Sequence, residues 1–165
     1  MTTGAARNRL ELIVQARSDA WFRTSLLLSA GDPEVARDVL QEVLERLVRR
    51  RLPDDANVDG YVTSSLVNAA RDRWRRHRSE ISLKGVERRH WDSLGHVDGD
   101  TGVILDLLRD LPDKQRAVLV LRYFEDLTEA DTAKAMQISV GTVKSQSHRA
   151  LARLRAAMQA DREAF

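Results

Sequence analysis

The sequence predicts an all-α protein made of two small helical domains joined by a flexible linker. Leu, Ala and Arg are abundant, whereas three prolines and eight glycines interrupt the 165 residues, and this composition favours helix. Apolar residues recur at spacings of three and four along most of the chain. The pattern weakens among glycines over 81–101, which predicts a linker. We therefore expect an N-terminal three-helix bundle over 8–80 and a C-terminal helix-turn-helix unit over 102–160.

The first two helices are delimited by a glycine and by a proline. The first is expected over about 8–29, and it ends before Gly31, which accepts the left-handed backbone found past a helix end. The second starts with Asp32 as N-cap and Pro33 in its first turn, and it ends near Arg51. Its broad apolar stripe comprises Val35, Val39, Leu40, Val43, Leu44, Leu47 and Val48.

The third helix is expected over about 60–78, after a polar loop over 52–59. One face carries apolar residues that include Trp74, and the opposite face carries polar residues at helical spacing. Trp21 and Trp74 could stack on bases, but core packing is the more economical interpretation. These three helices suffice to bury one small core.

The C-terminal unit is expected to contain a short helix over 103–111, an apolar helical segment over 117–124 after a restart at Pro112, and two helices over about 129–136 and 140–160. Thr128 and Asp131 resemble a capping box before the third of these. Ala133 stands where two helices must approach closely, and Ser139 caps the last helix.

Residues 128–155 therefore read as a helix-turn-helix with its turn at 137–139, in which Val143 and Leu151 anchor the last helix. Spacing alone also permits an ordinary helical hairpin. The turn often uses Gly, and Gln137 in a left-handed conformation would cost on the order of 1 kcal/mol.

Charge is strongly segregated behind a formal net charge of +2. Residues 31–45 carry five acidic side chains against one arginine, whereas 71–78 and 144–162 each carry five basic side chains against one aspartate. Two basic segments and one acidic segment suggest contacts with a polyanion and with a separate cationic partner. Any one segment alone could be an ordinary solvated helix face.

Several runs of residues, in order along the chain, resemble one family. Residues 117–128 (AVLVLRYFEDLT) and 139–145 (SVGTVKS) are similar to the promoter-binding C-terminal region of extracytoplasmic-function (group IV) RNA polymerase sigma factors. Residues 31–42 resemble the polymerase-binding helix of that family, and 67–76 resemble its helix for the upstream edge of the melted promoter. Together these matches span roughly 8–157.

The resemblance implies an alternative sigma factor that binds core RNA polymerase and directs transcription initiation. Its N-terminal domain would bind the polymerase clamp and the −10 element, and its C-terminal domain the polymerase flap and the −35 element of double-stranded promoter DNA. The linker would thread through the polymerase. The family often works with an anti-sigma factor, which makes such a protein a further candidate partner.

The resemblance also implies site residues. The expected polymerase contacts form an acidic face on the second helix: Asp38, Gln41, Glu42 and Glu45. The expected −10 contacts are Asn68, Arg71, Asp72 and Arg75, with Asp55 and Asn57 in a loop that holds an extruded base. The expected −35 contacts are Ser139, Thr142, Lys144, Ser145, Gln146, His148 and Arg149.

Two positions depart from the family pattern. A basic residue commonly stands at the position of Gln146, so phosphate contacts or −35 preference could differ here. Gly commonly stands at the position of Gln137, which bears on the geometry of the turn.

Other classes of protein are poorly supported. The chain has no cysteine, no Gly-rich phosphate loop and no metal-ligand spacing among His77, His90, His96 and His148, so we expect no catalytic site, metal or cofactor. No stretch approaches the ~18 apolar residues of a membrane span, and 1–9 lack the apolar core of a signal peptide. These features predict a cytoplasmic protein without membrane insertion.

Two alternatives remain open at this stage. A stand-alone helix-turn-helix regulator would use only residues 110–160 and would need a dimer surface or a ligand domain, neither of which the first 80 residues resemble. A protein-interaction module without DNA binding is disfavoured by the basic cluster over 71–78.

Overall fold

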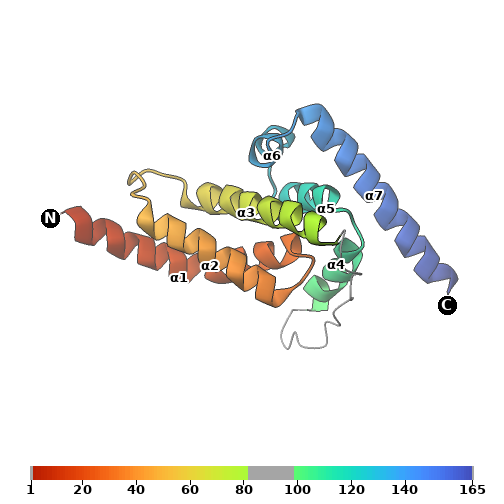
Figure 1. The fold of residues 1–165 in the computed structure, drawn as a ribbon, viewed down its shortest axis with the longest axis horizontal. Coiled ribbons are helices and arrows are strands. Elements are labelled where there is room, and N and C mark those ends of the chain that lie inside the picture. The colour runs from red at the N-terminus through yellow and green to blue at the C-terminus, as the bar shows by residue number, and fades with distance from the viewer. Residues whose placement is uncertain (1, 82–98, 165) are drawn as a thin grey trace.

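A computed structural model describes residues 2–81 and 99–164 of the chain. Within these residues the regular structure is helical throughout, in the order α1 to α5, a π-helical turn η1, α6 and α7 (Figure 1). The all-α prediction is confirmed. Most of the predicted linker over 81–101, together with His90 and His96, lies outside the described residues.

Three helices form the N-terminal part: α1 (Thr2–Leu28), α2 (Pro33–Arg49) and α3 (Val58–Ile81). Each contacts the other two, and their shared core includes Trp21, Val43 and Leu66, of which none is more than 2% exposed. The first helix begins earlier than predicted. The prediction missed its first turns because they are exposed and carry no apolar periodicity. In Figure 1 this end of α1 forms one extremity of the molecule.

The turn between α1 and α2 follows the predicted chemistry. Asp32 caps α2, since its Oδ1 accepts hydrogen bonds from the backbone N–H groups of Glu34 and Val35 at 3.0 and 3.2 Å. Gly31 has φ 81°, as expected of a residue that ends a helix. Ala30 is also left-handed, with φ 51°, and nothing in its residue type predicts this.

One member of the predicted apolar stripe of α2, Val48, does not lie in the core. Val48 is 70% exposed, whereas Val43 and Leu47 are fully buried. The stripe as predicted is wider than the surface that α1 and α3 can cover. Its outer edge therefore stays on the surface of the protein.

The C-terminal part contains α4 (Gly99–Arg109), α5 (Asp113–Leu119), η1 (Val120–Phe124), α6 (Glu129–Met136) and α7 (Val140–Glu163). The apolar segment predicted over 117–124 divides between α5 and η1. Glu125 N donates to Val120 O at 2.9 Å, the five-residue spacing of a π turn. Leu121 is buried, but Tyr123 is 62% exposed.

The two parts pack against each other, with α1 contacting α5 and η1, and α3 contacting α6. Arg116 of α5, 4% exposed, is central to this packing. Its Nε donates to the carbonyl of Leu28 at 3.3 Å, its Nη1 donates to the carbonyl of Leu111 at 3.0 Å, and it forms an ion pair with Asp113. Burial lowers the pKa of Arg116, and the charge of Asp113 offsets part of this effect.

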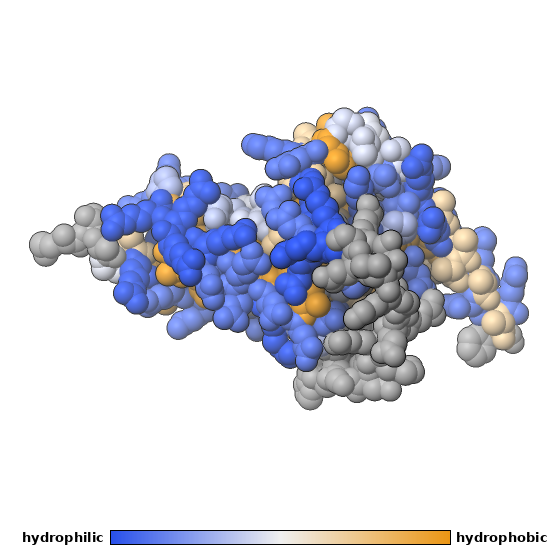
Figure 2. Space-filling model, viewed as in Figure 1, coloured by the Kyte–Doolittle hydropathy of each residue, from blue (hydrophilic) through white to orange (hydrophobic). Residues whose placement is uncertain are grey.

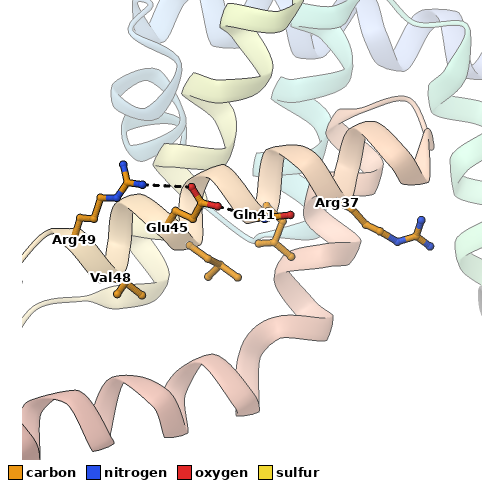
Figure 3. A pocket seen from close by; sticks show the side chains of 7 residues that line it. Arg37, Gln41, Glu45, Val48 and Arg49 are labelled. Carbon is orange, nitrogen blue, oxygen red and sulfur yellow. Dashed lines mark hydrogen bonds and ion pairs between the residues drawn. The ribbon is translucent and has the colours of Figure 1, made fainter.

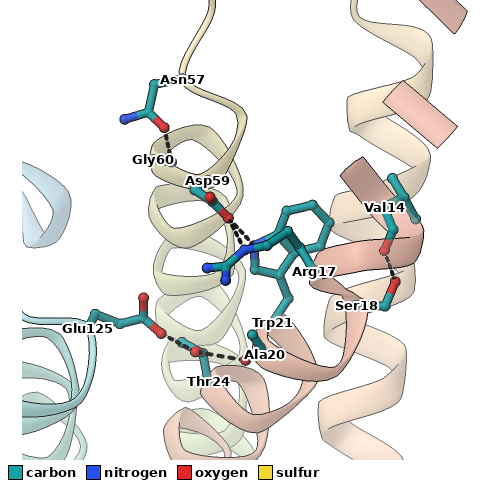
Figure 4. Close-up of polar contacts among 10 residues, drawn as sticks. All are labelled: Val14, Arg17, Ser18, Ala20, Trp21, Thr24, Asn57, Asp59, Gly60 and Glu125. Carbon is teal, nitrogen blue, oxygen red and sulfur yellow. Dashed lines mark hydrogen bonds and ion pairs between the residues drawn. The ribbon is translucent and has the colours of Figure 1, made fainter. Parts of the chain in front are cut away.

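A second polar contact joins the two parts. The Thr24 hydroxyl of α1 donates to the carboxylate of Glu125, directly after η1 (Figure 4). Thr24 is 1% exposed, so the bond lies at the edge of a protected region.

Candidate functional site

The turn between α6 and α7 has the geometry of a helix-turn-helix. Gln137 adopts the left-handed conformation, with φ 54° and ψ 44°. Ile138 N then donates back to Ala133 O at 3.0 Å, so that the chain closes α6 and starts α7 two residues later. Gln137 therefore takes the backbone conformation that glycine usually supplies, with a side chain exposed to solvent.

Both predicted caps of these helices are present. Thr128 Oγ1 accepts from Asp131 N at 3.0 Å and contacts Asp131 Oδ2 at 2.8 Å. The shorter aspartate thus bonds the Thr128 hydroxyl, where the glutamate of a standard capping box reaches back to the N-cap N–H. Ser139 Oγ accepts from Thr142 N at 3.1 Å and caps α7.

The first turns of α7 present a polar, basic surface. Lys144, Ser145, His148 and Arg149 are exposed, whereas Thr142 and Gln146 are half-buried and so are less outward than predicted. Val143 and Ala150 anchor the helix with no exposed surface, and the predicted anchor Leu151 is only half-buried.

One acidic side chain faces this basic surface. Glu129, the first residue of α6, has its Oε2 3.8 Å from the Lys144 ammonium. Sequence reasoning did not single out Glu129, because it lies fifteen positions before Lys144 and only the folded turn brings the two together.

A second basic surface lies on α3. Asp72 and Arg75 are exposed, and Asn68 and Arg71 are half-buried. Arg71 and Arg75 make no side-chain hydrogen bond or ion pair with the residues that the structure describes, so both cations are available to an external anion.

The start of α3 is tied to α1 by two hydrogen bonds to Asp59, the Asp59 clip, which sequence reasoning missed. Asp59 Oδ1 accepts from Arg17 Nε and from Trp21 Nε1, both at 2.9 Å (Figure 4). Trp21 is 2% exposed, which confirms it as a core aromatic with a satisfied N–H group. The only signal in the sequence was an acidic residue in the first turn of the third helix.

The two residues predicted to lie in the base-binding loop, Asp55 and Asn57, have different surroundings. Asp55 is exposed, and Asn57 caps α3 through its Oδ1, which accepts from Gly60 N at 2.9 Å. A Cβ on Gly60 would lie 2.8 Å from Asn57 Nδ2, so any larger residue here would require the Asn57 side chain to shift. The amide of Asn57 is thereby fixed in orientation.

The acidic face of α2 is more complex than its sequence suggests. Asp38, Gln41 and Glu45 are exposed and Glu42 is half-buried, but each has a partner. Arg73 lies 3.7 Å from Asp38, Arg46 pairs with Glu42, and Gln41 Nε2 donates to Glu45 Oε1 at 3.3 Å. The face is therefore a mixed network of charges.

A shallow groove runs along the same helix (Figure 3). Its lining residues combine apolar and polar side chains: Arg37, Leu40, Gln41, Leu44, Glu45, Val48 and Arg49. Figure 3 shows Glu45 between Gln41 and Arg49, with Arg49 Nη2 3.8 Å from Glu45 Oε2. Of the apolar lining residues Val48 is exposed, Leu44 half-buried and Leu40 buried, and apolar side chains inside a polar rim are typical of a protein-binding surface. The view in Figure 2 is largely hydrophilic elsewhere over α2 and α3.

The described residues, 2–81 and 99–164, give no sign of a metal site or of a membrane-spanning helix. No group of three or more His, Asp or Glu side chains there could hold a metal ion. None of the helices at 2–81 and 99–164 is long and apolar enough to cross a membrane.

These features define a helical protein with a helix-turn-helix and two cationic surfaces, and comparisons with known proteins identify its class. Residues 101–154 match the model of sigma-70, region 4. The RNA polymerase sigma-E factor of Streptomyces coelicolor is 36% identical over 148 residues, which cover 88% of this chain and 83% of that protein. The sigma-E factor of Streptomyces avermitilis is 36% identical over the same length, covering 88% of this chain and 82% of its own.

Among solved structures, the sigma factor RpoE from Bartonella quintana, in complex with the anti-sigma factor NepR, has the same fold. The TM-score is 0.72 at 21% identity, and the match covers 93% of this chain and 98% of that one. The chain belongs to the extracytoplasmic-function RNA polymerase sigma factors. It is an alternative sigma factor, which acts with core RNA polymerase and promoter DNA in transcription initiation.

Proposed function

We propose how the work of a sigma factor divides over this chain. Residues 8–80 bind the polymerase clamp and the −10 element, 81–101 link the two domains, and 102–160 bind the polymerase flap and the −35 element. The observation that carries the proposal is the capped, exposed and cationic start of α7, which is the form of helix that enters a DNA major groove.

In the −35 contact, the residues of α7 have different roles. Lys144 and Arg149 are exposed cations that neutralise phosphates, and His148 and Ser145 lie beside them. Half-buried Gln146 and Thr142 are restrained by packing, so Gln146 is suited to reading a base edge through its amide. Ser139 uses its hydroxyl as a cap, and its contribution to DNA binding is to orient the helix N-terminus.

In the −10 contact, Arg71 and Arg75 bind the DNA backbone, and Asn68 and Asp72 lie on the same side of α3 at spacings of three and four. Asp55 and Asn57 belong to the loop that receives an extruded base. The Asp59 clip supports this role, because it ties the start of α3 to α1 and so fixes the loop in advance of binding.

In the clamp contact, Gln41 and Glu45 surround exposed Val48, and we add Leu44 and Val48 to the acidic residues named from the sequence. Apolar contact in the groove supplies affinity, and Asp38, Glu42 and Glu45 orient the partner. Each of these carboxylates already lies beside an arginine of this chain, so a cationic partner must compete with an internal ion pair.

We further infer where in the cell the chain acts and which kind of partner regulates it. The chain has no catalytic role of its own and works in the cytoplasm, where its polymerase and DNA are found. An anti-sigma factor is a further partner, by analogy with the complex in which the solved relative was determined.

In vitro transcription tests the proposal. Purified chain is added to core polymerase with fragmented genomic DNA, and the 5′ ends of the transcripts are mapped. We expect a small set of discrete start sites that depend on the chain. If transcripts appear only when another sigma factor is present, the chain is a helix-turn-helix regulator and the proposal is wrong.

A further inference from the structure

An acidic side chain lies beside the basic surface of α7. Glu129 is the first residue of α6, and its Oε2 lies 3.8 Å from the Nζ of Lys144 near the start of α7. The side chain of Lys144 is 62% exposed and that of Glu129 41% exposed, so both charges are open to an approaching ligand. Asp131, the other acid in the first turn of α6, is instead engaged by the Thr128 hydroxyl. Glu129 is therefore the carboxylate that pairs with Lys144 within 2–81 and 99–164.

A carboxylate at this position opposes the binding of DNA. The first helix of a helix-turn-helix crosses the DNA backbone, so phosphates come near the start of α6 as well as α7. A phosphate that reaches Lys144 also comes close to Glu129, well within the screening length of about 8 Å at physiological salt. It can bind the Lys144 ammonium fully only by displacing the Glu129 carboxylate.

This displacement depends on how closely the duplex approaches. Non-specific binding rests on cations and phosphates alone, and in a loose complex of this kind water separates Lys144 from the DNA, so the ammonium stays with Glu129. Base contacts made by Gln146 would seat α7 in the major groove and bring a phosphate within hydrogen-bond distance of Lys144. Such a charge-assisted bond is short and strong enough to replace a pair at 3.8 Å.

We propose that Glu129 is a specificity-determining residue of the −35 contact. It holds Lys144 when the helix-turn-helix lies on a wrong sequence, and it gives Lys144 up to phosphate when the base contacts of α7 form. The pair thus disfavours wrong sequences more than the right one. This inference rests on the proposed function, in which α7 binds the −35 element.

Binding of the holoenzyme to two duplexes tests the proposal. One duplex carries a promoter located by start-site mapping, and the other is the same duplex with its −35 element scrambled, so the contributions of core polymerase and of the −10 element are common to both. Glu129→Gln keeps the size of the side chain and removes its charge. We expect it to raise the affinity for the scrambled duplex about 3- to 6-fold and that for the promoter less than about 1.5-fold. The ratio of the two affinities should therefore fall at least about 2-fold.

The chain offers a matched control in Glu11→Gln. Glu11 lies on α1, and its Oε1 is 3.2 Å from Arg7 Nε in an exposed ion pair, so the variant removes the same charge at a site outside the helix-turn-helix. Its ratio of affinities should equal that of the natural chain. An unchanged ratio in Glu129→Gln, or an equal fall in both variants, overturns the proposal.

A second background separates this role from a structural one. A carboxylate at the start of α6 also stabilises the helix by its interaction with the positive end of the helix dipole, and that effect does not involve Lys144. In a chain that already carries Lys144→Gln, we expect Glu129→Gln to leave the ratio unchanged. A fall as large as in the natural background would show that Glu129 does not act through Lys144, and it would overturn the exchange.

Failure of the proposed function looks different. The natural chain would then bind the promoter and the scrambled duplex equally, and Lys144→Gln would not weaken binding to either. In that case the role of Glu129 falls together with the assignment of α7. A natural chain that distinguishes the duplexes, with an unchanged ratio in Glu129→Gln, refutes the role of Glu129 alone.

Discussion

The guanidinium of Arg116 lies over the indole ring of Trp74, with its central carbon 5.9 Å from the ring centroid. The two residues belong to different helix-packing units, α5 and α3, so a charge from one unit is buried on an aromatic face of the other. Cation–π contacts of this kind gain strength when they are shielded from water. The pair therefore couples the stability of the chain to the relative position of its two cationic surfaces, on α3 and α7.

Replacement of Arg116 should destabilise the chain. Arg116→Met removes bonds to two carbonyls and to Asp113, and we expect a loss of about 2–4 kcal/mol in the free energy of unfolding. Urea denaturation followed by circular dichroism measures the change. Arg7→Ala, which removes an exposed i,i+4 pair with Glu11, is the control and should change stability by less than about 0.5 kcal/mol.

Replacement of the left-handed residue in the helix-turn-helix should stabilise the chain, in contrast to the replacement of Arg116. Gln137→Gly should raise the free energy of unfolding by about 0.5–1 kcal/mol, because glycine adopts φ 54° without steric cost. The matched control is Lys134→Gly, an exposed position inside α6, which should lower it by about 1 kcal/mol. Thermal melts of both variants decide, and a loss of stability in Gln137→Gly would show that the side chain matters more than the backbone.

Promoter binding should depend on one cation of the α3 surface and one cation of the α7 surface. Arg75→Ala and Arg149→Ala each remove an exposed cation, so both should weaken promoter binding and reduce the slope of log affinity against log salt by about one. Titrations of the holoenzyme with a labelled promoter at several salt concentrations measure both quantities. Arg7→Ala is again the control, and an unchanged slope in either test variant would contradict the assignment of that residue.

The groove on α2 predicts a defect in assembly with core polymerase. Val48→Asp places a charge among Leu44 and Leu40, and it should weaken core binding about tenfold or more while leaving the fold intact, since Val48 is 70% exposed. Leu12→Asp alters a side chain that is 60% exposed on α1, outside the groove, and should have no effect. Co-purification with core polymerase compares the two, and equal recovery would remove the groove from the clamp contact.

Features that depend on neighbouring residues were predictable from the sequence. The caps Asp32 and Ser139, the bounds of α6 and the left-handed turn at Gln137 all follow from residue types within a few positions of one another. Their free energies are local, so the pattern of residues is sufficient to indicate them.

Features that depend on distant residues were missed. The Asp59 clip joins positions 38 and 42 apart, and the bond from Arg116 to Leu28 joins positions 88 apart. Neither spacing leaves a periodic signal. Val48 was misplaced for a related reason, because its exposure depends on how much of α2 the other helices cover. The sites named from family resemblance stay predictions until the variants above are measured.

The π turn at Val120–Phe124 has a consequence for how this chain can vary. It holds one more residue per turn than an α-helix, and it lies between α5 and the helix-turn-helix. Deleting a single amino acid from it would restore an ordinary α-helical turn, and the residues downstream would keep nearly the same orientation. A deletion in the regular turns of α5 would instead rotate the residues downstream by about 100°, so the chain should accept a loss of one residue better within the π turn than beside it.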